Sequence, residues 1–380
     1  NGRSMVNSKA SEPLEEEPKL HRPRNARAPV SRPDSTRVQK HSLPPPAVPA
    51  GAFPTTRPTC CLLCAQCQKG SIEKPPQSPH SSAGMSAKLP VADRIASELL
   101  HWLPKQAWSR GMGWASRLPL PRPLRDPVYR GFSLAYGIDL GELDRPLGEF
   151  DRFDDFFCRP LPDGARSISP QHNALITPCD GVLSGYGVSE DGLCIHAKGQ
   201  EYTVAGLLND EVAAQRFVGG MFATIYLAPH NYHRVHSPLD GQITGYRHVP
   251  GARYPVNALS VRTVPRLFQR NERFVTYMRT EFGEVALVMV AATGVGNITV
   301  SYEPALATPA GGPDRGACIY EHGQEKPISK GAELGKFHLG STVILLFERG
   351  RASIDVPAGT VVRLGQPIGQ LTPSKQGQTS

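Results

Sequence analysis

The chain has 380 residues, of which 39% are hydrophobic and 20% charged, enough for one large domain or two ordinary ones. Its longest apolar runs, such as residues 285–292, are far shorter than the roughly 20 residues of a membrane-spanning helix, which excludes a transmembrane protein. The net charge is +8, but residues 1–84 hold 12 lysines and arginines against 6 acidic residues. The nearly neutral remainder does not indicate a nucleic-acid-binding protein.

Residues 1–84 contain 14 of the 37 prolines and show no apolar periodicity. Such a segment buries too little apolar surface to offset its ordering entropy, so we expect a disordered extension. The alternative that this extension is not native stays open. Cys60, Cys61, Cys64 and Cys67 could supply four thiolates to a zinc ion, but no flanking hydrophobic pattern would support a metal-bound unit. We therefore expect no metal site there.

Residues 85–130 are expected to form an amphipathic helical region. Apolar residues recur at helical spacing between positions 92 and 103, and the chain's three tryptophans follow among basic residues: Trp102, Trp108 and Trp114. Indole rings and cations suit the surface of an anionic bilayer. On spacing alone, packing of this stripe on the protein's own core is the favoured alternative.

Residues 131–380 are expected to form the catalytic domain, and its β-strand patterns begin near residue 175. Short apolar or alternating runs are separated by turn residues, at 193–197, 222–227, 241–246, 274–279, 285–292, 298–302 and 343–348. Beyond the first third of the chain, helical patterning is limited to residues 204–215. The predicted class is α+β, with an N-terminal amphipathic helical layer followed by a mostly antiparallel, barrel-like β core.

Four segments contain residues suited to chemistry: residues 177–181, 232–238, 282–298 and 335–347. Taken singly, each has an ordinary explanation as a turn or a strand. The two histidines of Tyr-His-Arg-Val-His-Ser-Pro lack a second cluster of ligands, so we expect no metal there. Ser341 lies in Leu-Gly-Ser-Thr and lacks the Gly-x-Ser-x-Gly turn, which argues against a serine hydrolase.

In this order and spacing, the four segments resemble the phosphatidylserine decarboxylases, in the bacterial and mitochondrial branch with Leu-Gly-Ser-Thr. The resemblance covers residues 85–370. It implies a carboxy-lyase that converts phosphatidylserine to phosphatidylethanolamine and carbon dioxide. It also implies a homodimer at an anionic membrane surface, on the cytoplasmic face of the bacterial membrane or, alternatively, at the mitochondrial inner membrane.

The resemblance further implies that the protein makes its own cofactor, a covalent pyruvoyl group, and needs neither metal nor pyridoxal phosphate. Ser341 would attack the carbonyl of Gly340 and split the chain into a β chain ending at residue 340 and an α chain of residues 341–380. A serine hydroxyl needs a base, which by motif position is His236, oriented by Asp180. Gly340 offers an unhindered carbonyl.

His233 is the expected proton donor to the decarboxylated carbon, because imidazole titrates near neutral pH. In an extended segment, His233 and His236 would point to opposite faces and serve different tasks. Tyr254, Asn257 and Arg273 are further candidates for contacts to the lipid headgroup.

Three other functions stay open on sequence grounds. One is a pyruvoyl decarboxylase of a related amino-acid headgroup or a free amino acid. Another is a lipid-binding homologue that never matures, although Ser341, His236 and Asp180 are all present. The third is a serine hydrolase.

Overall fold

The structure is a computed structural model that describes residues 105–189, 194–197, 200–256, 258–293, 297–309, 312–338 and 341–373. The predictions for residues 1–84, with their four cysteines, and for the helix up to residue 103 lie outside the described residues. Asn257 and Gly340 lie outside them too. The described residues all belong to one of the two units into which the chain divides, Ala83–Ser380.

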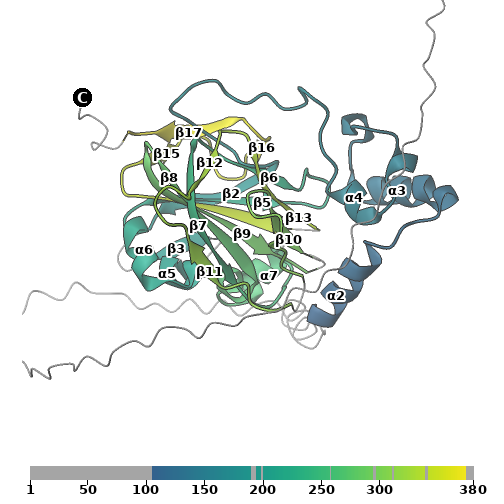
Figure 1. The fold of residues 1–380 in the computed structure, drawn as a ribbon, viewed down its shortest axis with the longest axis horizontal. Helices are drawn as coiled ribbons and strands as arrows, with labels where there is room; N and C mark the ends of the chain where they lie inside the picture. The colour runs from purple at the N-terminus through teal and green to yellow at the C-terminus, as the bar shows by residue number, and fades with distance from the viewer. Residues whose placement is uncertain are drawn as a thin grey trace, which may run out of the picture. The chain divides into compact units, whose positions relative to one another are not determined.

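The core of the described chain is a nine-stranded sheet in which every pair of strands is antiparallel (Figure 1). The order is β11 (Ala317–Ile319), β7 (Gly241–Val249), β8 (Arg273–Thr280), β9 (Gly283–Ala291), β14 (Ser341–Phe347), β5 (Met221–Leu227), β2 (Gly181–Val188) and β16 (Val361–Val362), with β12 (Lys326–Ile328) also on β7. The predicted antiparallel core is confirmed. Among the described strands the sheet has two ends, at β11 and β16, so it is not a closed barrel.

Strand β14 lies near the middle of this sheet, between β9 and β5. All seven of its residues are buried, from Ser341 to Phe347. A continuous apolar run of this length is typical of a strand covered on both faces. Ser341 is the first residue of this strand and is itself fully buried.

Three smaller sheets complete the β structure. They are β1 (Ala174–Ile176) with β17 (Pro367–Leu371) and β15 (Ala352–Ile354); β10 (Ile298–Val300) with β13 (Glu333–Phe337) and β6 (Arg234–His236); and β3 (Cys194–Ala197) with β4 (Gln200–Thr203). Strands from the two sides of position 341 pair with one another: β14 lies between β9 and β5, β16 pairs with β2, and β17 pairs with β1.

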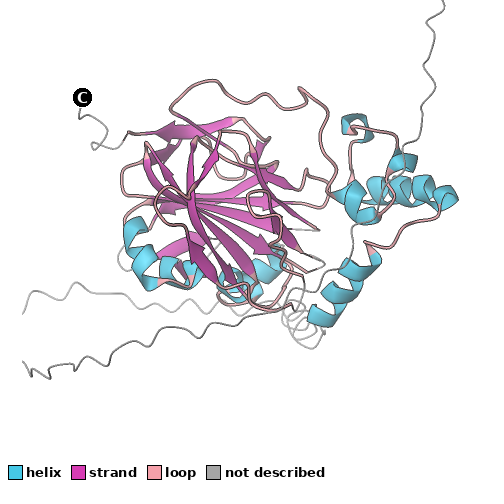
Figure 2. Cartoon of the chain, viewed as in Figure 1, coloured by secondary structure: helices cyan, strands magenta, loops and turns pink. Residues whose placement is uncertain are grey.

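Helices are short and few beside the strands (Figure 2). The helix predicted over 204–215 is present as α5 (Val204–Leu208) and α6 (Glu211–Ala214), followed by the 3₁₀ turn η3 (Gln215–Phe217). Two helices were not predicted, α7 (Ala258–Thr263) and α8 (Leu267–Arg270). Their six and four residues are too short for a periodic pattern to identify.

The N-terminal part of the described chain is helical, as predicted. It contains α2 (Lys105–Ala115), α3 (Arg122–Tyr136), the 3₁₀ turns η1 (Leu140–Glu142) and η2 (Leu147–Glu149), and α4 (Phe153–Phe157). This part has its own apolar cluster, in which the ring of Tyr129 stacks on Phe156 with centroids 4.7 Å apart. No described helix combines the length and apolarity needed to cross a bilayer.

Candidate active site

Ser341 and Asp180 lie at the same end of the main sheet. Ser341 opens β14 and pairs with Leu227, the last residue of β5. On the other side of β5, Val182 of β2 pairs with Tyr226, and Asp180 directly precedes β2. Since neighbouring strands are about 4.8 Å apart, β14 and β2 present these ends roughly 10 Å from one another.

The hydroxyl of Ser341 is buried and has no hydrogen-bond partner among the described residues. Leaving a buried hydroxyl unpaired costs about 1–3 kcal/mol. A strand position of this kind would ordinarily hold an apolar residue. The unpaired Ser341 Oγ is therefore free to attack a neighbouring carbonyl.

His236 ends β6 and lies against the turn that precedes Asp180, since its backbone N–H donates to the carbonyl of Pro178 at 2.8 Å. Its Nδ1 lies 2.7 Å from the carbonyl of Gly331 and therefore carries the hydrogen. The lone pair is then on Nε2, where the hydroxyl of Tyr232 donates at 3.1 Å. Burial lowers the pKa of His236, so the ring is a neutral base near pH 7.

Asp180 is hydrogen-bonded to Arg166 and not to His236. The guanidinium of Arg166 donates to its carboxylate at 2.6 and 3.1 Å, and the backbone N–H of Leu364 donates at 2.8 Å. Arg166 also donates to Glu142 at 2.7 Å. Asp180 acts on His236 only through space, where its charge opposes the lowering of the histidine's pKa.

His233 is fully buried directly before β6. Burial alternates along this segment, with His233 and Val235 buried and Arg234 and His236 half-buried, which places the two histidines on opposite faces. The Nδ1 of His233 donates to the carbonyl of Asn231 at 2.7 Å, and its Nε2 has no partner among the described residues. The ring packs on Phe157, with centroids 4.2 Å apart, and burial lowers the pKa of His233 to about 3.

Two of the residues predicted to contact the lipid headgroup, Tyr254 and Arg273, are buried and hydrogen-bonded to other parts of the fold. Arg273 is buried, and its guanidinium donates to backbone carbonyls: those of Gly206, Leu207, Gln269 and Asn271. These hydrogen bonds satisfy the buried guanidinium within the fold, so its burial needs no ligand. Tyr254 is also buried, and its hydroxyl accepts from Arg270 at 3.2 Å. Headgroup binding by Tyr254 and Arg273 stays a prediction.

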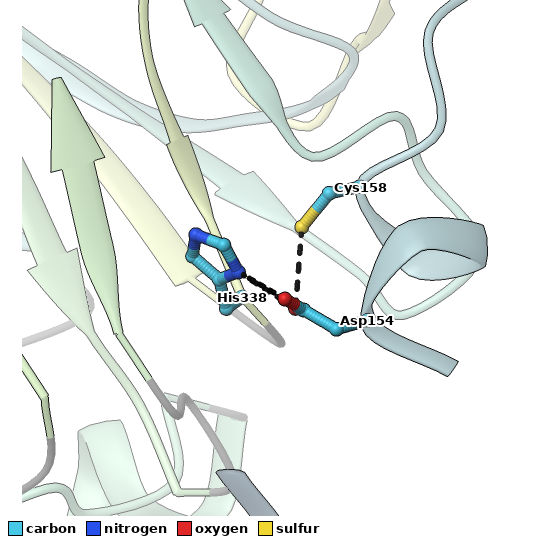
Figure 3. A group of neighbouring side chains, drawn as sticks. All are labelled: Asp154, Cys158 and His338. Atoms are coloured by element: carbon cyan, nitrogen blue, oxygen red, sulfur yellow. Dashed lines mark hydrogen bonds and ion pairs between the residues drawn. The ribbon is translucent and has the colours of Figure 1, made fainter. Parts of the chain in front are cut away.

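A second polar cluster lies just before the predicted cleavage site (Figure 3). His338 Nδ1 lies 2.6 Å from a carboxylate oxygen of Asp154 on α4, and the thiol of Cys158 lies 3.7 Å from the same carboxylate. The thiol also donates to the carbonyl of Phe337 at 3.2 Å. These three donor groups could bind a metal ion, which the sequence did not predict, but here they satisfy one another. The cluster joins α4 to the segment two residues before Gly340.

Sequence reasoning missed Tyr232, Arg166 and the Asp154–His338 pair. Tyr232 lies within the Tyr-His-Arg-Val-His-Ser-Pro motif, at i−4 from His236, and that position was its only local signal. Arg166 and Asp154 are joined to their partners over 14 and 184 positions, and no local pattern indicates such pairs.

Similarity to known proteins identifies the family of this chain. The sequence profile of phosphatidylserine decarboxylase matches residues 153–370. The phosphatidylserine decarboxylase proenzyme of Anaeromyxobacter sp. (strain K) is 45% identical over 282 residues, which cover 73% of this chain and 98% of the relative. The proenzymes of Myxococcus xanthus and Brevibacillus brevis are 43% and 38% identical, over 74% and 73% of this chain and 99% and 98% of the relatives. The chain therefore belongs to the phosphatidylserine decarboxylase family.

Proposed function

We propose that this protein decarboxylates phosphatidylserine with a pyruvoyl group that it makes from Ser341. The observation that carries the proposal is the unpaired, buried Oγ of Ser341 at the first position of β14, at the same sheet end as Asp180. When formed, a pyruvoyl ketone binds the substrate's amine and accepts the electron pair released as carbon dioxide leaves. The proenzyme names of the relatives support a cleaved, two-chain enzyme.

Self-cleavage begins when the Oγ of Ser341 attacks the carbonyl carbon of Gly340. An ester C–O bond forms and the peptide C–N bond breaks, while His236 Nε2 takes the hydroxyl proton and passes it to the leaving nitrogen of residue 341. Loss of the Cα proton of residue 341 then breaks the Cβ–Oγ bond and leaves that electron pair on a carboxylate of Gly340. The remaining unsaturated residue takes up water and releases ammonia, which gives the pyruvoyl group.

His236 is suited to the first step because its tautomer is fixed. The Gly331 carbonyl holds the hydrogen on Nδ1, and the lone pair on Nε2 already accepts a hydroxyl hydrogen from Tyr232. Exchange of the Tyr232 hydroxyl for that of Ser341 would bring nucleophile and base together, as catalytic hydrogen bonds often form only in the reacting complex. Glu333, the partner of His236 across β13 and β6, and Asp180 both stabilise the protonated ring through space.

The cleaved chains would stay associated without the peptide bond. The seven residues of β14 pair with β5 on one side and β9 on the other, and β17 pairs with β1. Residues from position 341 onward thus supply β14 and β17, and each of these strands is paired with at least one strand of the preceding chain. Cleavage at Gly340 would leave this pairing unchanged.

His233 is the residue we assign to proton transfer at the reacting carbon. Its Nε2 is buried, unpartnered and unprotonated in the substrate-free chain. A negative charge that enters beside it raises its pKa, so the imidazole can take up a proton and later deliver it to the carbon that loses carbon dioxide.

Binding to an anionic membrane surface is supported by the helical region. Of the twelve large hydrophobic side chains that are exposed in the described chain, seven lie between residues 112 and 136: Met112, Trp114, Leu118, Leu124, Val128, Leu134 and Tyr136. Exposed arginines share these helices, among them Arg122 and Arg130. Apolar side chains beside cations suit a helix that lies in the headgroup region. Homodimer formation stays a prediction.

The proposed function is tested with liposomes that contain phosphatidylserine labelled in the serine carboxyl group. The purified protein is expected to release labelled carbon dioxide and to leave phosphatidylethanolamine, whereas Ser341→Ala releases none. Free labelled serine serves as the parallel substrate. Release from free serine but not from the lipid would contradict the proposed substrate, and release by Ser341→Ala would contradict the proposed cofactor.

A further inference from the structure

Arg159 is a buried arginine in which two of the three guanidinium nitrogens have no hydrogen-bond acceptor among the described residues. Its side chain is 3% exposed, and neither Nε nor Nη1 has a hydrogen-bond acceptor among the described residues. Arg273, buried to the same degree, donates to four backbone carbonyls. Burying a guanidinium without acceptors costs several kcal/mol, so such a residue calls for a physical explanation.

Arg159 lies on a turn that contacts both the histidine segment and the chain before the cleavage site. Its guanidinium carbon is 5.7 Å from the ring centre of Phe156, and Phe157 packs on His233. The preceding residue, Cys158, donates its thiol hydrogen to the carbonyl of Phe337 and accepts at its own carbonyl from Arg234.

Among the described residues, no carboxylate forms a direct ion pair with Arg159. Glu142 and Asp180 are the carboxylates that act on it through space, and both are hydrogen-bonded to Arg166. The positive charge of Arg159 also reaches His233 and contributes to the low pKa of that imidazole, after the larger effect of burial. A buried cation with free donors is thus present beside a buried neutral base.

We propose that Arg159 is a carboxylate-binding residue that accepts an anion produced or bound during the reaction. The inference rests on the proposed function, because self-cleavage creates a carboxylate on Gly340. Gly340 follows His338 by two residues, which span at most about 7 Å, and His338 is held to α4, the helix that ends two residues before Arg159. A buried guanidinium whose Nε–H and Nη1–H have no acceptor among the described residues can donate a charge-assisted hydrogen bond to a carboxylate.

The serine headgroup of the substrate carries the same chemistry, a carboxylate beside an amine. The anion has two candidate sources, the new C-terminus of the β chain and the incoming lipid. The experiment below distinguishes them. Binding of the new C-terminus would stabilise the leaving carboxylate and accelerate cleavage. Binding of the lipid would lower KM and leave cleavage unchanged.

The test measures self-cleavage of Arg159→Ala by intact mass over time, with and without added guanidinium ion. Loss of a charge-assisted hydrogen bond is expected to slow cleavage about 10- to 100-fold. Guanidinium is expected to restore much of the rate in a saturable manner, because it can occupy the space left by the side chain. Arg125→Ala is the matched control, since Arg125 is buried but bonded to the carbonyls of Leu120 and Gly148. It should cleave at the wild-type rate with no response to guanidinium.

The second arm measures KM and kcat for phosphatidylserine on fully cleaved protein. Slow cleavage with unchanged KM assigns the anion to Gly340, and normal cleavage with raised KM assigns it to the lipid. Wild-type cleavage together with wild-type KM would overturn the inference, as would a slow variant that guanidinium does not rescue. If Arg159→Ala misfolds, Arg159→Lys keeps the charge and should show intermediate values of the same quantities. Failure of the wild-type chain to cleave would instead reject the proposed function.

Discussion

The helical region around α2 and α3 and the end of the main sheet at Ser341 both carry unfavourable features, but of opposite kinds. In the helical region, apolar side chains such as Trp114 and Leu134 are 68% and 86% exposed. At the sheet end and in the segment before β6, the polar atoms Ser341 Oγ and His233 Nε2 are buried without a partner among the described residues. Each feature becomes favourable only with something added: a lipid surface for the first, and a reacting group for the second.

The helical region and the sheet end would also contact the lipid substrate in different ways. In the proposed function, the helical region would bind the membrane without taking part in bond breaking, and the sheet end would cleave the chain without a membrane. Variants in the two regions should therefore change different measurements, and a variant that changes both would break the distinction.

The largest effect is expected for Ser341→Ala, which removes the attacking oxygen at the sheet end. The protein should remain one chain of full mass and release no carbon dioxide. Ser353→Ala, at an exposed serine in β15, should cleave normally. Two chains from Ser341→Ala would show that another residue makes the cut.

His236→Ala should slow self-cleavage by about 10²–10⁴-fold, because it removes the base that takes the serine proton. Since burial lowers the pKa of His236, the wild-type rate should be flat near neutrality. It should fall on acidification, with a midpoint below the usual imidazole value near 6.5. His322→Ala, at a histidine that is 99% exposed, is the control. Normal maturation of His236→Ala would remove this histidine from the mechanism.

His233→Ala should cleave but decarboxylate roughly 10²-fold more slowly, as expected when a proton-transfer group is lost. The measurement is carbon dioxide release per cleaved chain, so that incomplete maturation does not enter the rate. If this variant matures no better than His236→Ala, the two histidines do not have separate tasks.

A double change in the helical region, Trp114→Ser with Leu134→Ser, should weaken binding to anionic liposomes about 10- to 100-fold, because two large apolar side chains no longer enter the bilayer. Self-cleavage in solution should be unchanged. Val212→Ser, at an apolar residue that is 78% exposed on α6, should leave liposome binding unaltered. Equal binding of all three proteins would mean that another surface meets the lipid.

The smallest effect concerns the acid stability of the uncleaved Ser341→Ala protein. His233 has a folded pKa of about 3, against roughly 6.5 in an unfolded chain, so between these values only the unfolded state binds the proton. Lowering the pH from 6.5 should therefore reduce the free energy of unfolding by about 1.4 kcal/mol per pH unit through this residue. His233→Asn should lack that contribution in denaturant titrations at pH 7, 6 and 5. Parallel pH dependences of the two proteins would place His233 in a solvated site.

The strands around Ser341 could be predicted from sequence because their signal is local. The runs at 222–227, 285–292 and 343–348 are continuous and apolar, and they form β5, β9 and β14. Closure into a barrel could not be predicted, because it depends on whether β11 and β16 meet, and they are distant in the chain.

Motifs in the sequence predicted the residues of the candidate site, whose roles stay predictions, but not their hydrogen bonds. Motif spacing indicated Asp180, His236 and Ser341, and the fold places Ser341 and Asp180 at one sheet end. The partners of these residues come from remote segments: Arg166 on Asp180 and the Gly331 carbonyl on His236. Arg159 gave no sequence signal for a role of its own, since an unpaired donor is visible only when all neighbours are in place.

The intact mass of the purified wild-type chain, before and after borohydride reduction, tests the central claim most directly. The account predicts two chains that divide between Gly340 and Ser341, with the smaller one blocked at its N-terminus and heavier by two hydrogen atoms after reduction of its ketone. A single chain with an unmodified serine at position 341 would contradict it.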